Sequence, residues 1–439
     1  MSGAPLLFAS SRGGAAASAF STALLQGLAP DGGLYVPQRW PQLPPEDFQG
    51  ARALAEVGAR LLAPFVAGDE LAPQLDEILG EAFNFPAPRV GLTDDERLSA
   101  LELFHGPTAA FKDFGARFLA AAFARLRVTH TRPLTILVAT SGDTGGAVAA
   151  AFHGRAGIKV VVLFPKGLVS PTQERQLTCW GGNVRALAVR GTFDDCQRLV
   201  KQAFLDESLR ARTALASANS INLGRLLPQS IYYAATSLDI LRRYGERASF
   251  IVPSGNLGNA LACLWARQLG LPIGEVILAH NANRAVPDFL ASGEWRPRPS
   301  IATLASAMDV GNPSNMERLR ALFPELQELR GAVSACSVTD AEIRTRIRVG
   351  YEEYGQIWCP HTAIAAEAWE RLPEEKRARG RWVLVATAHP AKFPEIVEPL
   401  IGRAVPVPPS LAALFARPSE STELEADLAA LRALLEERG

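Results

Sequence analysis

Four short apolar runs, rich in β-branched residues, constrain the fold of this chain more than any other feature. They lie at residues 134–138, 159–164, 249–252 and 382–385, and the first three each lead into a glycine-bearing turn and a helical pattern. Strands that are apolar throughout and alternate with helices are typical of a parallel sheet that is buried on both faces. The pattern predicts an α/β protein whose ligands lie where strand ends meet helix starts.

The two ends of the chain differ from this central pattern. The first 85 residues contain no strong strand run, but residues 18–28 and 52–62 are apolar at helical spacing, which predicts a small helical unit. Pro86 and Pro88 mark the connection that follows. Residues 419–439 predict a charged amphipathic helix. A chain of 439 residues exceeds what one compact core usually holds, so two or three packed units are expected.

Composition excludes several functional classes. The 45 basic and 45 acidic side chains balance, so no overall field attracts nucleic acid. The five cysteines are scattered without a C-x-x-C pair, and the six histidines show no i, i+4 pair, so neither a disulfide framework nor a metal site is expected. Nowhere do eighteen apolar residues follow one another. We expect a cytoplasmic protein that has a small-molecule substrate and no membrane or nucleic-acid partner.

Amine chemistry is restricted to six lysines, and Lys112 is the one with unusual neighbours. It lies between Phe111 and Phe114, whereas a solvated lysine rarely has aromatic residues on both sides. Partial burial lowers the pKa of an amine, as a Schiff-base lysine requires. A salt bridge between Lys112 and the adjacent Asp113 is an equally good interpretation of the same residues.

Two glycine-rich loops follow predicted strands and precede predicted helices, at residues 139–146 and 253–259. The free amide groups and dipole of a helix start suit a phosphate or a carboxylate. Neither loop has the P-loop or dinucleotide-binding pattern, and either alone is better interpreted as an ordinary capped helix start. Two such loops after parallel strands favour two anion sites that face one crevice. Lys166 and Lys392 also lie in loops suited to anion contacts.

Four segments together closely resemble the threonine synthases, which are pyridoxal-phosphate enzymes of the tryptophan-synthase-β fold type. The segments are FHGPTAAFKDFG at 104–115, TSGDTG at 140–145, PSGNLGN at 253–259 and TAHPAKF at 387–393. The resemblance extends to residues 26–37 and 308–315, so it covers nearly the whole chain. One departure is Leu257, where the family commonly has phenylalanine.

The resemblance implies fold type II, with two parallel-sheet α/β domains and a small helical N-terminal domain. Residues 1–85 would form the threonine-synthase-type N-terminal domain, and residues 86–439 the catalytic region that binds pyridoxal 5'-phosphate. Within that region, a smaller α/β subdomain would span roughly residues 125–225, and the remainder would form the larger domain.

The resemblance also assigns roles to residues. Lys112 would hold the cofactor as a Schiff base, Thr387 would face its pyridine nitrogen, and Asp143 would lie near its ring oxygen. The cofactor phosphate would lie on the backbone of Gly255, Asn256 and Leu257, with Asn259 beside them. Ser254 and Gly258 would also bind the cofactor. The substrate carboxylate would lie on Thr140, Ser141, Gly142 and Thr144. The remaining substrate contacts, including the candidates for its phosphate, would be Lys166, Asn222, Arg225 and Lys392.

The implied reaction converts O-phospho-L-homoserine and water to L-threonine and phosphate, as the last step of threonine biosynthesis. One alternative is a related phospho-lyase that releases 2-oxobutyrate, phosphate and ammonia. Another is a binding protein that has kept the fold and lost the chemistry, against which the intact Lys112 and both loops argue. The sequence is compatible with a monomer or a homodimer.

Overall fold

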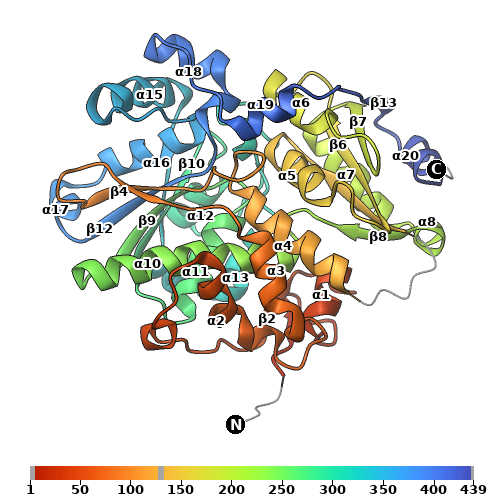
Figure 1. The fold of residues 1–439 in the computed structure, drawn as a ribbon, viewed down its shortest axis with the longest axis horizontal. Coiled ribbons are helices and arrows are strands. Elements are labelled where there is room, and N and C mark those ends of the chain that lie inside the picture. Colours follow the sequence, from red (N-terminus) through yellow and green to blue (C-terminus); the bar gives the residue numbers. More distant parts are fainter. Residues whose placement is uncertain (1–4, 127–132, 437–439) are drawn as a thin grey trace.

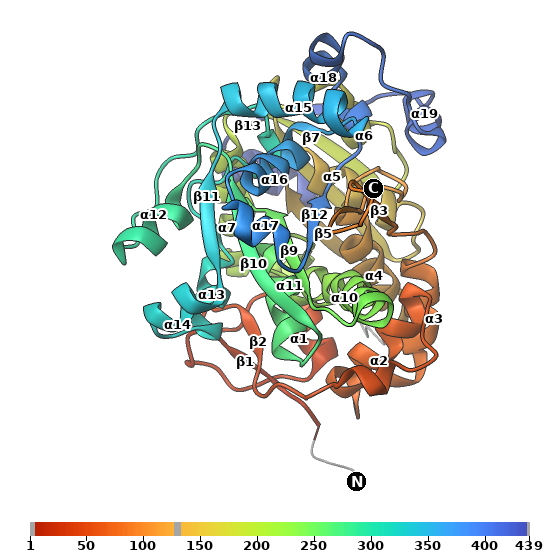
Figure 2. The ribbon, with the colours of Figure 1, turned by 90° about the vertical axis from the view of Figure 1, so that its left-hand side faces the viewer.

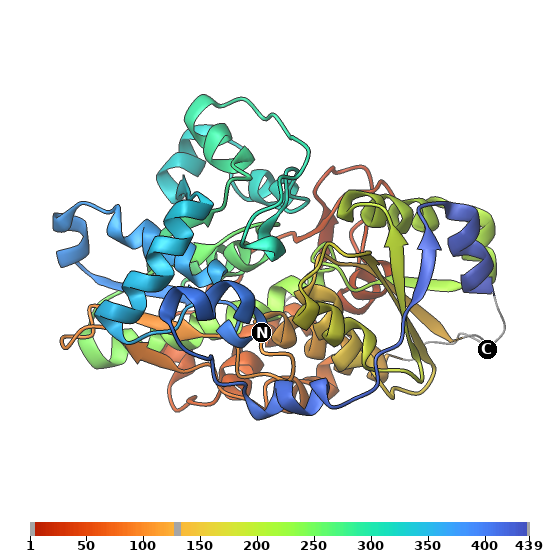
Figure 3. The same cartoon turned by 90° about the horizontal axis from the view of Figure 1, so that it is seen from above.

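The computed structural model describes residues 5–126 and 133–436. Two β-sheets lie side by side, and the N-terminal elements lie below them in the view of Figure 1. Seen from above, the elements of the larger sheet are on the left of Figure 3 and those of the smaller sheet are on the right. His130, one of the six histidines, lies outside the described residues.

The larger sheet has six strands in the order β11-β10-β9-β12-β4-β3, and only β3 is antiparallel to its neighbour. The strands are β3 Arg89–Gly91, β4 Leu98–Glu102, β9 Ala248–Pro253, β10 Ile273–His280, β11 Ser334–Ser337 and β12 Arg381–Ala386. Figure 2 shows α16 (Pro360–Glu370) above this sheet, and α10 (Ser230–Tyr244) and α11 (Gly258–Gln268) below it. Neighbouring side chains on β9 point to opposite faces, so Phe250 packs with α10 and α11 while Ile251 packs with α16.

The smaller sheet has five parallel strands in the order β13-β7-β6-β5-β8. They are β5 Leu134–Ala139, β6 Ile158–Pro165, β7 Val184–Arg190, β8 Ala214–Ser217 and β13 Thr422–Glu425. Val138 packs on the side of α5 (Asp143–Phe152), and Leu137 packs on the side of α7 (Phe193–Leu205). The four apolar runs thus form β5, β6, β9 and β12, and the predicted α/β class with parallel sheets is confirmed, because both faces of each run are buried.

The N-terminal elements contain the two expected helices, α1 (Phe20–Gln26) and α2 (Leu54–Val66), followed by α3 (Leu75–Ala82). They also contain a short antiparallel pair, β1 (Phe8–Ser10) and β2 (Tyr35–Pro37), which the sequence did not indicate. A strand of three residues is too short for its side-chain alternation to be recognised.

The C-terminal segment differs from the single helix expected over residues 419–439. It forms β13 and then α20 (Leu428–Glu436), and residues 437–439 lie outside the described part. Figure 3 shows this segment crossing to the edge of the smaller sheet, where β13 pairs with β7, although the sequence-based division assigned it to the larger unit. The strand has one buried residue, Leu424, so its local pattern contains too little apolar signal to predict the pairing.

The remaining helices complete the covering of the sheets. They are α4 Lys112–Arg125, α6 Pro171–Thr178, α8 Glu207–Arg212, α9 Leu223–Leu226, α12 Ala285–Ser292, α13 Met316–Leu322, α14 Leu326–Ala332, α15 Asp340–Tyr354, α17 Glu374–Ala378, α18 Pro394–Ile401 and α19 Pro409–Phe415. None of the helices in the described residues is long and apolar enough to cross a membrane. Within residues 5–126 and 133–436, no group of three or more His, Cys, Asp or Glu side chains is arranged to hold a metal ion.

Candidate active site

A pocket of about 100 Å³ lies where the ends of β5, β9 and β12 meet the starts of α4, α5 and α11. Because the carboxyl ends of parallel strands meet at one edge of a sheet, segments far apart in the sequence come together there. Most of the sequence-predicted site residues line this pocket: Lys112, Thr140, Ser141, Asp143, Thr144, Arg225, Ser254, Gly255, Asn256, Leu257, Gly258, Asn259 and Thr387. Four others do not line it: Gly142, Lys166, Asn222 and Lys392.

Lys112 is the first residue of α4, and backbone contacts fix its position. The amide N–H of Phe111 donates to the carbonyl oxygen of Thr387 at 2.8 Å. The carboxylate of Asp113 accepts hydrogen bonds from the backbone N–H of Thr108 at 2.9 Å and from its hydroxyl at 2.7 Å. Asp113 is therefore committed to Thr108, and the alternative in which it pairs with Lys112 is not what the structure shows.

The amine of Lys112 instead lies 4.0 Å from a carboxylate oxygen of Asp143. Burial lowers the pKa of Lys112 to about 8, with Asp143 opposing the shift and the nearby Lys392 and Arg225 adding to it. With a pKa of about 8, about a tenth of the amine is neutral at pH 7, far more than for an ordinary lysine, so it can exchange protons and act as a nucleophile.

Lys392 is completely buried beneath this pair. Its ammonium donates to Asp143 at 2.8 Å and to the carbonyl oxygen of Thr108 at 2.9 Å. Burial alone would raise the pKa of Asp143, but the charges of Lys392 and Lys112 hold it below its ordinary value. The sequence placed Lys392 on a substrate group, whereas the structure shows it as the partner of Asp143.

The loop between β9 and α11 lines one side of the pocket with residues 254–259. Leu257 has φ 62°, which turns the chain into α11. A Cβ on Gly255 would lie 2.7 Å from the Cα of Met308, so only glycine fits. The side-chain oxygen of Asn259 accepts from the hydroxyls of Tyr232 and Tyr233 at 2.6 and 2.9 Å, while its buried amide nitrogen has no partner in the described residues. That orphan donor suits an anionic ligand.

The loop between β5 and α5 is organised by Thr140. Its hydroxyl oxygen accepts from the backbone N–H groups of Gly142 and Gly145, each at 2.9 Å. Gly142 has φ 141°, and a Cβ at this position would lie 2.5 Å from the side chain of Gln173, so a larger residue would not fit. Ser141 and Thr144 line the pocket and make no side-chain hydrogen bond within the described part of the chain.

The remaining substrate candidates lie in different surroundings. Lys166 is about half exposed and pairs with Glu423 on β13. Asn222 is fully buried and donates to the carbonyl oxygens of Leu24 and Ser217 at 2.8 and 2.9 Å. Arg225 lines the pocket, and burial lowers its pKa to about 10, so it stays charged at neutral pH while its Nε has no partner in the described residues.

Several pocket residues were not singled out from the sequence. They include His361 at the start of α16, whose pKa burial lowers to about 4 and whose Nε2 accepts from the backbone N–H of Ala307 at 3.2 Å. Ser220, which accepts a hydrogen bond from Asn256 at 2.6 Å, is another. No local motif marks either residue, although Ser220 lies only five residues before Arg225.

Comparison with known proteins places the chain in two steps. A family model described as pyridoxal-phosphate dependent enzyme matches residues 86–388, so the chain is an enzyme of that class, with pyridoxal phosphate as its cofactor. Models for the threonine synthase N terminus and C-terminal region match residues 7–83 and 362–435. The chain is 42% identical to the threonine synthase of Haemophilus influenzae over 95% of this chain and 96% of that one. It therefore belongs to the threonine synthase family.

Solved structures agree with this assignment. The threonine synthase of Escherichia coli matches with a TM-score of 0.89 and 38% identity, over 98% of this chain and 99% of that chain. A threonine synthase with bound pyridoxal phosphate from Brucella melitensis matches with a TM-score of 0.88 and 36% identity, over 98% and 99% of the two chains.

We predict that Gly255→Ala weakens the site. Because the new Cβ would meet the backbone of Met308, a loss of about 1–3 kcal/mol in the free energy of unfolding is expected, together with weaker cofactor binding. Chemical denaturation and titration with pyridoxal phosphate measure the two effects. Gly331→Ala is the control, because nothing lies within 4 Å of its Cβ position in α14. Equal free energies of unfolding and equal cofactor affinities for the two variants would contradict the close packing of Gly255 against the backbone of Met308.

Proposed function

We propose that this protein converts O-phospho-L-homoserine and water to L-threonine and phosphate. The observation that carries the proposal is the buried amine of Lys112, with its lowered pKa, in a pocket bounded by two loops suited to anions. The relatives that match over nearly the whole chain are threonine synthases. Nothing in the fold or the site favours the phospho-lyase alternative.

The residues present fit pyridoxal phosphate. Lys112 offers an amine for covalent attachment, the backbone at Gly255 leaves no room for a side chain, and the amide of Asn259 is an unsatisfied donor. We assign the cofactor phosphate to the loop from Ser254 to Asn259 and the pyridine nitrogen to the hydroxyl of Thr387. Bound pyridoxal phosphate supplies an electron sink for the negative charge that develops at substrate carbon atoms.

The chain supplies the proton transfers. With the cofactor bound, Lys112 would accept a proton from the substrate Cα and then one from Cβ, and its pKa near 8 suits both uptake and release of a proton. Asp143 stays ionised close to this amine, because the ammonium of Lys392 forms an ion pair with it. The γ-phosphate would then leave, Cγ would gain a proton to become the methyl group, the hydroxyl of water would add at Cβ, and Cα would regain a proton. The remaining proton of water would go to the released phosphate.

We assign substrate binding to pocket side chains that still have polar atoms without a hydrogen-bond partner in the described residues. We place the substrate carboxylate on Ser141 and Thr144, in a loop that Thr140 holds in shape. We place the substrate phosphate on Arg225, whose guanidinium is charged and only partly hydrogen-bonded. Asn222 caps α9 and thereby positions Arg225 on that helix. Lys166 would reach a substrate only by leaving Glu423.

Arg225→Met is expected to reduce kcat/KM for phosphohomoserine by about 10- to 100-fold, because a charge-assisted contact with phosphate is lost. Competitive inhibition by inorganic phosphate should weaken in parallel. Arg267→Met is the control, because this arginine contacts the carbonyl oxygens of Gly274 and Ala332 and does not line the pocket. Unchanged phosphate inhibition in Arg225→Met would show that another group holds the phosphate.

Product analysis tests the reaction itself. Purified protein given phosphohomoserine is expected to release L-threonine and phosphate in equal amounts. The appearance of 2-oxobutyrate and ammonia with phosphate, but without threonine, would assign the protein to the phospho-lyases. We propose that the reaction takes place in the cytoplasm, in keeping with five cysteines that are all free.

A further inference from the structure

Arg318 on α13 differs from the other buried cations. Four arginine and lysine side chains are buried in the described residues: Arg225, Arg318, Arg381 and Lys392. Lys392 and Arg381 each pair with a carboxylate, and Arg225 lines the catalytic pocket. Arg318 has no carboxylate within 4.0 Å in the described part of the chain and does not line the pocket. An unpaired charge in the interior is costly, so an anion that balances Arg318 is expected.

Four oxygen atoms hold the guanidinium of Arg318. Its Nε donates to the carbonyl oxygen of Tyr35 on β2 at 2.9 Å, and its Nη2 donates to that of Ile221 at 2.7 Å. Its Nη1 donates to the carbonyl oxygen of Ser220 at 3.2 Å and to the side-chain oxygen of Asn315 at 2.8 Å. These acceptors are neutral, so they satisfy the hydrogen bonds and leave the positive charge unbalanced.

Arg318 stays charged at neutral pH. Burial lowers its pKa to about 9, and the neighbouring Glu317 opposes the shift. The carboxylate of Glu317 is itself occupied nearer the surface, where it forms an ion pair with Arg12 and accepts a hydrogen bond from Ser11. Within the described part of the chain, the positive charge beside α13 is therefore not balanced by an acid in contact with it.

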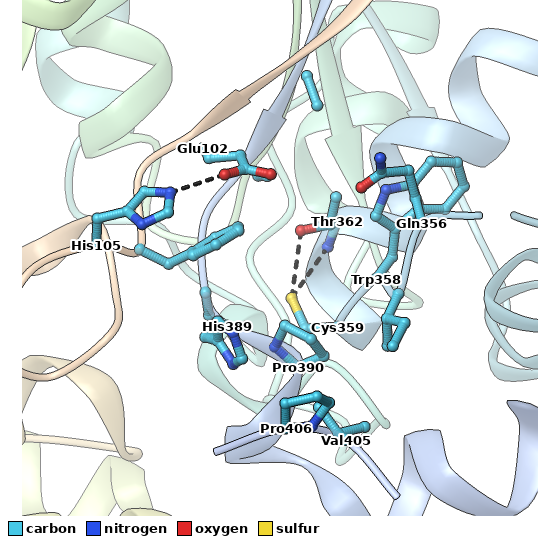
Figure 4. Close-up of a pocket in the computed structure, with 15 residues that line it drawn as sticks. Glu102, His105, Gln356, Trp358, Cys359, Thr362, His389, Pro390, Val405 and Pro406 are labelled. Atoms are coloured by element: carbon cyan, nitrogen blue, oxygen red, sulfur yellow. Dashed lines mark hydrogen bonds and ion pairs between the residues drawn. The ribbon is translucent and has the colours of Figure 1, made fainter. Parts of the chain in front are cut away.

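Two cavities could hold an anion that balances this charge. The cavity of about 330 Å³ beside β4 and β12 contains the carboxylate of Glu102, which lies 2.7 Å from Nε2 of His105 (Figure 4). A carboxylate disfavours a second anion, and none of the residues that line this cavity bonds to Arg318. The catalytic pocket is the better candidate, because it is lined by Ser220, a direct partner of Arg318.

The partners of Arg318 contact the loop to which we assign the cofactor phosphate. The hydroxyl of Ser220 accepts from Nδ2 of Asn256 at 2.6 Å, and both residues line the pocket. A Cβ on Gly258, the first residue of α11, would lie 3.8 Å from the side-chain nitrogen of Asn315. Arg318 thus lies one side chain behind the start of α11, and its charge adds to the positive end of that helix dipole.

We propose that Arg318 is a positioning residue that makes the site selective for a phosphorylated cofactor. Its hydrogen bonds fix the segments at Ser220 and Asn315 against the phosphate loop, and its charge balances that of the phosphate from behind the loop. A charge acts over a longer distance in a poorly hydrated interior than in water. This role rests on the proposed function, in which the cofactor phosphate lies on residues 254–259.

The preference of the protein for a phosphorylated ligand measures this role. Full-length protein is titrated with pyridoxal phosphate and with pyridoxal, which carries the same aldehyde without the phosphate, and the ratio of the two Kd values is compared among variants. Arg318→Gln keeps amide donors and removes the charge, so the preference should fall by about tenfold or more, with little change for pyridoxal. Arg318→Lys keeps the charge and should retain the preference to within about threefold.

Asn315→Asp tests the charge with the arginine in place, and it decides the question if Arg318→Gln does not fold. The new carboxylate still accepts from Arg318 while it balances the charge, so the preference should fall by about tenfold. Arg267→Met is the matched control and should leave the preference unchanged. Its guanidinium also donates to backbone carbonyl oxygens, those of Gly274 and Ala332, but it lies at the far end of α11 and does not line the pocket.

Two results would overturn the role of Arg318. The first is a preference for pyridoxal phosphate that persists in Arg318→Gln, or in Asn315→Asp if the former does not fold, even where both ligands bind more weakly. The second is an equal loss of the preference in Arg318→Lys and Arg318→Gln, which would assign the effect to hydrogen-bond geometry instead of charge. A wild-type protein that binds both ligands equally would contradict the assignment of the phosphate to residues 254–259, and the role of Arg318 with it.

Discussion

Lys112→Ala is expected to lower kcat for threonine formation by about 10³-fold or more, because the variant loses both the covalent attachment of the cofactor and the group that moves protons. Lys112 is the only lysine among the residues lining the pocket in the described part of the chain, and the nearby amine of Lys392 is bound to Asp143 and to the carbonyl oxygen of Thr108. Threonine and phosphate release measure the rate, and the visible absorbance of the purified protein measures cofactor attachment. The absorbance band should be lost or shifted.

The matched control is Lys159→Ala, which removes an exposed lysine on β6. It should retain both the band and the activity. A Lys112→Ala variant with a wild-type spectrum and wild-type turnover would show that the cofactor is held elsewhere. If the wild-type protein shows no absorbance band even with added pyridoxal phosphate, it does not bind the cofactor, and the proposed reaction is then wrong as well.

Lys392→Met is expected to lower the free energy of unfolding by about 3–5 kcal/mol, because it leaves the carboxylate of Asp143 buried without its closest partner. Chemical denaturation measures the loss. The double variant Lys392→Met/Asp143→Asn should recover much of it, since no buried charge then lacks a partner. Failure of the double variant to recover would show that Lys392 matters for packing rather than for the charge of Asp143.

Lys166→Met provides the contrast, because both lysines were equal candidates for an anion contact in the sequence. Lys166 forms a surface ion pair with Glu423, in which each side chain is nearly half exposed. Such pairs contribute about 0–1 kcal/mol, so its loss should be small. Comparable losses in Lys166→Met and Lys392→Met would contradict the difference in burial.

The same Lys392 variant should change the chemistry of Lys112. The charge of Lys392 contributes to the lowered pKa of Lys112, so its removal raises that pKa and leaves less neutral amine at neutral pH. Reductive methylation of the apoprotein with formaldehyde, followed at the Lys112 peptide by mass spectrometry, reports the neutral amine. The wild-type rate should rise with pH and level off above about 8, and the variant profile should move to higher pH.

The sequence alone determined the main framework of the fold. The four apolar runs predicted β5, β6, β9 and β12 to within one residue at each end, because strands buried on both faces are continuously apolar. The glycine-rich loops at their ends predicted where a ligand would lie, since glycine and a helix start have a local signature. Short strands such as β1, β2 and β13 were not predicted, because each is only three or four residues long.

The tertiary structure alone decided which charged groups are partners. Lys112 and Asp113 are adjacent, yet Asp113 bonds to Thr108 and Lys112 lies near Asp143 on another helix. Lys166 directly follows β6 and Lys392 lies in the loop between β12 and α18, but the first is at the surface and the second is fully buried. Burial and charge pairing depend on which distant segments pack together, and a local pattern of residues contains no record of that packing. The sequence therefore indicated where the pocket lies, and the packing of the folded chain decided the surroundings of each lysine.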